Sequence, residues 1–215
     1  MLIKTLAHEI HENALNHGWY DNNRKLPEIV ALIQSEYSEA LEEARAERPL
    51  VWYGCNHYTQ AEPVICDAAA CPNADGVHVS TDDCYFRGKK PEGIAVELID
   101  GVIRILDFCG HVDAEFTDTD TGFPSEMESL YNGRSGFAPD DIPGDVPTLV
   151  AYLHAITSQA ILQNMYDTEE VVYHLTCAMS FALTWIHKQG IDPLKLILEK
   201  HKYNKDRPYK HGKAF

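Results

Sequence analysis

Apolar side chains recur along most of this chain with the three-to-four-residue period of an α-helix. This period predicts six helices, over residues 2–17, 27–48, 91–110, 147–164, 168–189 and 192–204. Pro27 suits the first turn of its helix, and Asn16-His17-Gly18 is a typical helix exit. We see no sustained strand alternation outside residues 50–89. The pattern therefore predicts an all-α core.

Two irregular stretches divide the helical pattern. Residues 50–89 carry Gly, Pro, Asn, Asp and Cys without a period, which indicates a long insertion that is functional or held by its own cross-links. Residues 112–146 are rich in Asp, Thr, Gly and Pro. We expect a first helical part at 1–111 with the insertion at 50–89, an irregular connection at 112–146, and a second helical half with a basic tail at 147–215.

The two helical halves show a weak internal similarity. Residues 30–40 align with residues 150–160, and the helices that follow align Glu97 and Asp100 with His174 and Cys177. A duplicated helix pair would form a pseudo-dimer within one chain, with the paired acids of a metal site in the first half only. The alternative is a chance match between amphipathic helices, in which case we expect a homo-oligomer.

Composition narrows the class of protein. The chain has 215 residues, 45% of them hydrophobic, and a net charge of −15. Such a charge disfavours a broad surface for nucleic acid or anionic membranes. No apolar run reaches the ~18 residues of a membrane span, and the N-terminus lacks a signal-peptide pattern. We therefore expect a cytoplasmic protein without nucleic-acid or membrane partners.

Two carboxylate pairs carry the chemical signal: Glu36 with Glu39, and Glu97 with Asp100. The members of each pair are three residues apart, a spacing that places side chains on one face of a helix. Like charges this close destabilise a helix by roughly 0.2–0.5 kcal/mol unless a cation offsets them. Mg²⁺ binds oxygen ligands and commonly keeps substrate phosphates in its shell. The pairs therefore predict metal-assisted phosphate chemistry.

The helix over residues 94–108 is apolar around nearly its whole circumference, as buried helices are. Its charged residues form one narrow stripe: Glu97, Asp100, Arg104 and Asp107. Buried acids must be neutralised by a basic side chain, a metal ion or both. Packing this stripe against the first carboxylate pair would gather several acids around a cation. The alternative is that the acids face solvent and that Asp100 and Arg104 form a salt bridge.

Together these residues resemble the MazG-like family of all-α nucleoside triphosphate pyrophosphohydrolases. Glu-x-x-Glu on one helix and Glu-x-x-Asp on the next is the family's signature, and the neighbouring residues are similar too. The matching segments are residues 31–36, 38–43, 90–98, 102–107 and the tail 202–213. The likeness covers about 8–48, 89–111 and 190–213. The insertion at 50–88 and the stretch 112–189 depart from a single-copy member, which leaves the oligomeric state and substrate access open.

The resemblance implies a reaction and a set of site residues. The reaction converts a nucleoside triphosphate, with ribose or deoxyribose, to the monophosphate and diphosphate by attack of a metal-activated water on the α-phosphorus. Mg²⁺, with Mn²⁺ as an alternative, would bind Glu36, Glu39, Glu97 and Asp100. Glu36 or Glu39 would accept the proton of the water. Other residues would contact the substrate, namely Lys202, Arg207 and Asn204 at the phosphates and Trp19 at the base.

The cysteines of the insertion allow a second kind of site. Structural zinc at Cys55, Cys66, Cys71 and Cys84 is one interpretation, but the spacing contains no Cys-x2-Cys pair. Unlinked thiols that pack as small apolar groups are the other. A non-catalytic helical adaptor that binds a protein through this loop is the alternative to an enzyme.

Overall fold

The computed structural model describes residues 3–22, 24–54, 90–116, 142–162 and 167–207. Its elements, in chain order, are α1 (Ile3–Asn16), α2 (Leu26–Arg45), β1 (Trp52–Gly54), β2 (Lys90–Glu92), α3 (Ile94–His111), α5 (Val146–Leu162), α6 (Thr168–Lys188) and α7 (Pro193–Lys205). Helices account for 74% of the described residues. The predicted all-α fold is confirmed.

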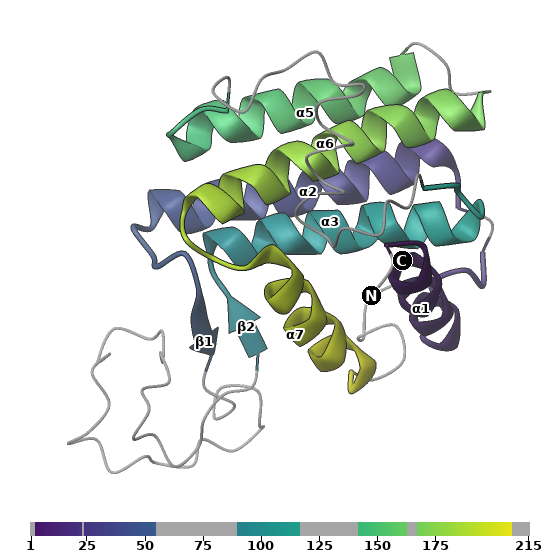
Figure 1. The fold of residues 1–215 in the computed structure, drawn as a ribbon, viewed down its shortest axis with the longest axis horizontal. Coiled ribbons are helices and arrows are strands. Elements are labelled where there is room, and N and C mark those ends of the chain that lie inside the picture. The colour runs from purple at the N-terminus through teal and green to yellow at the C-terminus, as the bar shows by residue number, and fades with distance from the viewer. Residues whose placement is uncertain (1–2, 23, 55–89, 117–141, 163–166, 208–215) are drawn as a thin grey trace.

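Helices α2, α3, α5 and α6 lie side by side as a bundle, and α1 and α7 flank α3 on the side away from α5 (Figure 1). Helix α3 contacts α1, α2, α6 and α7, so it is enclosed on most sides. This position explains its largely apolar circumference, because most of its faces pack against other helices. The core is continuous through all six described helices.

A glycine sets the close approach of α2 and α3. A Cβ atom at Gly101 would lie 2.4 Å from Cε1 of Tyr37, which is fully buried on α2. No real Cβ contact is that short, so any larger residue would force the helices apart. Because Glu36 precedes Tyr37 and Asp100 precedes Gly101, this contact also sets the separation of the two acids.

A short hairpin replaces the predicted first turn of the third helix. Strands β1 and β2 pair antiparallel, with Tyr53 opposite Pro91. Gly93 then turns with a φ of 109°, and a side chain there would meet the carbonyl oxygens of Pro49 and Leu50 at 2.7 and 2.8 Å. The sequence predicted that this helix begins near Pro91. In the structure α3 begins at Ile94 instead. The hairpin ties the start of α3 to the end of α2.

Helix α5 packs on α2 in a reciprocal way. The alignment of residues 30–40 with 150–160 also matches the buried side chains: Ile29, Val30, Ile33, Glu36, Tyr37 and Ala40 on α2 correspond to Leu149, Val150, Leu153, Ile156, Thr157 and Ala160 on α5. Gln34 Nε2 donates to Ser158 Oγ at 3.0 Å, and Ser38 Oγ lies 3.4 Å from His154 Nε2. In the alignment, Gln34 corresponds to His154 and Ser38 to Ser158. Each of the two contacts is therefore the counterpart of the other, as a local two-fold axis would produce. Descent from a duplicated helix pair stays a prediction.

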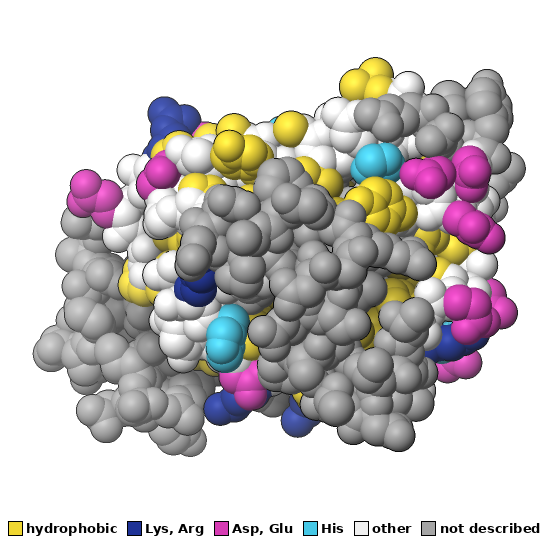
Figure 2. All heavy atoms as spheres, turned by 45° about the horizontal axis from the view of Figure 1, so that its top comes forward, with side chains coloured by type: hydrophobic (Ala, Val, Ile, Leu, Met, Phe, Trp, Pro, Cys, Tyr) yellow, Lys and Arg dark blue, Asp and Glu magenta, His cyan; other side chains and the backbone are white. Residues whose placement is uncertain are grey.

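On the face drawn in Figure 2, basic side chains of the described residues lie in separate groups, and acidic side chains are most numerous along the right edge, with others at the upper left and at the bottom. None of the described helices combines the length and the apolar character that crossing a membrane requires.

Candidate metal centre

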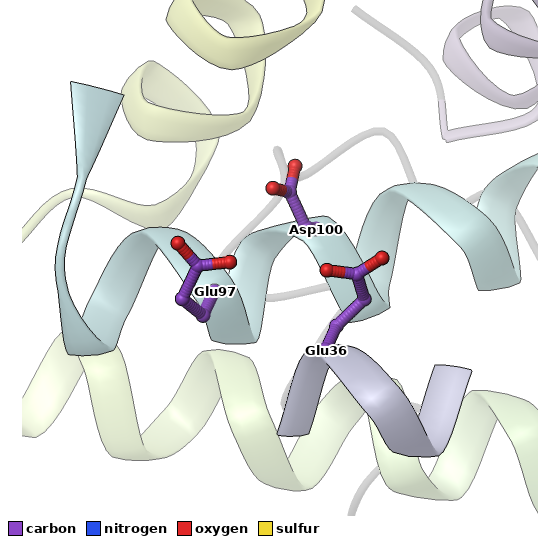
Figure 3. Close-up of side chains that lie close together, drawn as sticks. All are labelled: Glu36, Glu97 and Asp100. Atoms are coloured by element: carbon purple, nitrogen blue, oxygen red, sulfur yellow. The ribbon is translucent and has the colours of Figure 1, made fainter. Parts of the chain in front are cut away.

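Three of the four predicted acids meet in space. Glu36 comes from α2, and Glu97 and Asp100 come from successive turns of α3. Each offers one carboxylate oxygen such that the three atoms lie within 4.8 Å of one another. Figure 3 shows the three side chains pointing into the same space beside α3. The i, i+3 spacing and the tight α2–α3 contact together produce this arrangement.

Two basic side chains neutralise two of these acids. Arg104 Nε and Nη2 both lie 2.6 Å from Glu36 Oε1. Lys200 Nζ lies 2.8 Å from Asp100 Oδ2 and donates to the Pro91 carbonyl at 3.2 Å. The Lys200 side chain is only 2% exposed. The predicted alternative, a salt bridge between Asp100 and Arg104, is not formed, because Arg104 pairs with Glu36 on the neighbouring helix.

Glu97 has no neutralising partner among the described residues. It is 6% exposed, and burial together with the nearby Asp100 and Glu36 carboxylates raises its pKa to about 9, against the attraction of Lys200. Burial, with Asp100 and Glu39 nearby, also raises the pKa of Glu36, although Arg104 opposes this. At neutral pH a buried carboxyl in this position must hold a proton or bind a cation.

The donor set fits a hard divalent cation. All three ligand atoms are carboxylate oxygens, which suit Mg²⁺, Mn²⁺ or Ca²⁺ better than metals that favour nitrogen and sulfur ligands. Three carboxylates against two basic side chains leave one acid uncompensated in this part of the chain. A cation would supply the missing charge and the missing partner of Glu97. The residues therefore fit the ion that the family resemblance implies.

The acids line one end of a cavity of about 190 Å³. Glu39, the fourth predicted acid, also lines this cavity but is an exposed residue outside the close cluster. It has no ion pair or hydrogen bond to other described residues. Its carboxylate is therefore available at the mouth of the site.

Helix α7 forms the opposite wall, and it brings a cation that sequence reasoning missed. Predicted residues Asn204 and Arg207 line the cavity, whereas Lys202 is exposed and is not a lining residue. The lysine that reaches the acids is Lys200 instead. Helical spacing (i, i+4) places Lys200 and Asn204 on one face of α7 and Lys202 on another, and Arg207 follows the end of the helix. The spacing alone does not show which of these faces meets the acids.

The far end of the cavity is formed by α1, the loop after it and the start of α2. Trp19 lines this end, as predicted for a base-binding residue. Arg24 Nε donates to the Trp19 carbonyl at 2.7 Å, and its guanidinium lies 5.2 Å from the indole centre. Asp107 is not part of the acid cluster, since it lies 2.8 Å from His11 Nδ1. The Asp107 carboxylate adds to the effect of burial in raising the pKa of Tyr20.

Protein-family models, curated proteins and solved structures yield no match to this chain. The likeness to the MazG-like family therefore rests on the motifs described above. The predicted zinc ligands Cys55, Cys66, Cys71 and Cys84 lie outside the described residues.

Proposed function

We propose that this protein is a Mg²⁺-dependent nucleoside triphosphate pyrophosphohydrolase, which cleaves its substrate to the monophosphate and diphosphate. The observation that carries the proposal is Glu97, a buried carboxyl without a partner among the described residues, beside two further carboxylates at one end of a cavity. Burying such a group without compensation costs several kcal/mol or forces protonation. Binding of a cation at this site would offset that cost.

Glu36, Glu97 and Asp100, with Glu39 at the cavity mouth, would hold the metal. When bound, Mg²⁺ would polarise phosphate oxygens and make water a stronger nucleophile at neutral pH. Mn²⁺ has similar ligand preferences and is expected to substitute. The structure offers no sulfur or imidazole ligand within the described cluster, which disfavours zinc at this position.

The chain's own groups account for the remaining requirements. Arg104 and Lys200 hold Glu36 and Asp100 in place through charge-assisted hydrogen bonds. Arg207 lines the cavity on the α7 side, where its charge would stabilise a diphosphate leaving group. Glu39, exposed and unpaired among the described residues, is the carboxylate placed to accept the proton of the attacking water.

The test is a panel of ribo- and deoxyribonucleoside triphosphates incubated with Mg²⁺, with mono- and diphosphate products separated by chromatography. We expect monophosphate and inorganic diphosphate, and loss of turnover in Glu97→Gln, Glu39→Ala and Asp100→Ala. Glu97→Gln is the sharpest of these variants, because glutamine matches the protonated carboxyl in size, which preserves the fold, but cannot become the carboxylate that binds a cation. Glu42→Gln, at an exposed residue paired with Arg45, is the matched control.

Undiminished turnover in Glu97→Gln would remove the proposal. The adaptor alternative predicts a different result with Mg²⁺ and a non-hydrolysable triphosphate. The folded enzyme would bind Mg²⁺ and the triphosphate analogue, so its melting temperature should rise when both are added, whereas that of an adaptor should not.

A further inference from the structure

Two neighbouring polar atoms on α7 lack hydrogen-bond partners among the described residues. His201 is 3% exposed, and its Nε2 atom is buried without a partner. Asn204 Oδ1 is buried without a partner as well. Both residues line the cavity, and their i, i+3 spacing places them on the same face of the helix. A buried polar atom without a partner costs about 1–3 kcal/mol, so two together call for an explanation.

The pair is neutral. Burial, aided by the nearby Lys205 charge, lowers the pKa of His201 to about 4, so its imidazole carries no charge at physiological pH. A neutral imidazole offers no positive charge to a phosphate chain, and an amide oxygen cannot pair with phosphate oxygens, because both only accept hydrogen bonds. They suit a group that donates and accepts at once, which describes a hydroxyl.

The position of the pair along α7 points to the part of a nucleotide that it would meet. Lys200, one residue before, contacts the acid cluster through Asp100. Beyond the other end of α7, the chain reaches the loop that follows α1, since His17 Nε2 lies 2.9 Å from the Arg207 carbonyl oxygen. Trp19, two residues after His17, lines the far end of the cavity. The order along the wall is therefore acids, neutral pair, aromatic end, and in a nucleotide the sugar lies between the phosphates and the base.

We propose that His201 and Asn204 bind a sugar hydroxyl of the substrate, so that the hydroxyls of the sugar determine specificity. A single hydroxyl can donate to Asn204 Oδ1 and accept from the Nε2–H group of the neutral His201 imidazole. This inference rests on the proposed function. It adds a specificity-determining residue, His201, and assigns Asn204 to the sugar instead of the phosphates.

The experiment measures kcat/KM of the wild-type chain with four triphosphates of one base: ribo, 2′-deoxy, 3′-deoxy and 2′,3′-dideoxy. The base is the best one from the substrate panel. We expect the dideoxy compound to be at least about tenfold poorer than the best hydroxyl-bearing one, because a site built to hydrogen-bond a hydroxyl rejects the analogue that lacks it. In His201→Phe and Asn204→Leu this ratio should fall toward one. Lys195→Met, at an exposed position of the same helix, should keep the wild-type ratio.

Thermal unfolding separates this role from a structural one. Removing an unsatisfied polar atom should not lower the melting temperature of the ligand-free His201→Phe chain. A lower melting temperature with an unchanged ratio would show a structural residue and overturn the inference. If His201→Phe does not fold, the ratio in His201→Gln and Asn204→Leu decides instead.

The remaining outcomes distinguish the two proposals. Turnover with equal kcat/KM for the dideoxy and hydroxyl-bearing substrates would refute the sugar site and leave the enzyme assignment intact. The same holds if the wild-type preference persists in both α7 variants, since other groups would then read the sugar. No turnover of any triphosphate would overturn both proposals.

Discussion

Replacement of Glu97 by glutamine should remove a pH dependence of stability from the metal-free protein. Burial and two neighbouring carboxylates raise the pKa of Glu97 to about 9 from an ordinary value of 4.5. Between these values the folded chain holds a proton that the unfolded chain has released. The free energy of unfolding therefore falls as the pH rises through this window, and the contribution is complete only below the unfolded pKa.

The slope follows from the linkage relation. One proton gives at most about 1.4 kcal/mol per pH unit, so Glu97 lowers stability by at most about 2.7 kcal/mol between pH 6 and pH 8. Glutamine mimics the protonated carboxyl in size and remains neutral. The Glu97→Gln chain should thus gain on the wild type by up to this amount over the same range. Mg²⁺ should stabilise the wild type more at pH 8 than at pH 6, because binding displaces the proton.

Urea unfolding followed by helical circular dichroism, in chelator and in Mg²⁺, measures these free energies. The difference between wild type and variant is the informative quantity, since proton linkage from the 11 histidines is common to both chains. Glu42→Gln is the control, because an exposed ion pair contributes about 0–1 kcal/mol without a steep pH trend. Parallel pH profiles for wild type and Glu97→Gln would refute the reasoning that Glu97 is buried and uncompensated.

Further substitutions test the surroundings of the acids. Lys200→Met should lower the free energy of unfolding of the metal-free chain by about 3 kcal/mol, because it leaves Asp100 without its partner. The double variant Lys200→Met/Asp100→Asn should recover part of this loss. Equal stability of the single and double variants in thermal unfolding would contradict the pairing. Gly101→Ala should lower the free energy of unfolding by about 1–3 kcal/mol, since the new methyl would meet Tyr37. Calorimetry should also show weaker Mg²⁺ binding to this variant. Gly144 has open space around it, so Gly144→Ala should change the free energy of unfolding by less than about 1 kcal/mol in thermal unfolding.

Local periodicity was sufficient to predict the helices. The predicted helix over residues 147–164 corresponds to α5 at Val146–Leu162, and the one over 168–189 to α6 at Thr168–Lys188. Helical spacing was also sufficient to place Glu97 and Asp100 on one face. The hairpin was missed because β1 and β2 are three residues each and pair across the 35 residues that separate them. Such short strands leave no alternation to detect.

The identity of the cation beside the acids could not be read from the chain in the same way. Lys200 and Lys202 belong to the same basic segment, and both are consistent with a substrate-binding tail. Only the docking of α7 against α3 makes one of them 2% exposed and leaves the other at the surface. The packing of α2 against α3 likewise determines that Arg104 pairs with Glu36 on α2 and not with Asp100 on its own helix.

The amino-acid sequence by itself determined the six helices and the two acid pairs, because these depend on neighbours within one or two turns. Tertiary structure decided which acids converge, which basic side chains neutralise them and which one is left without a partner. Those outcomes depend on contacts between residues far apart in the chain, such as Glu36 with Arg104 and Asp100 with Lys200. Charge and burial at the candidate site are therefore properties of the packed helices, and no single segment contains them.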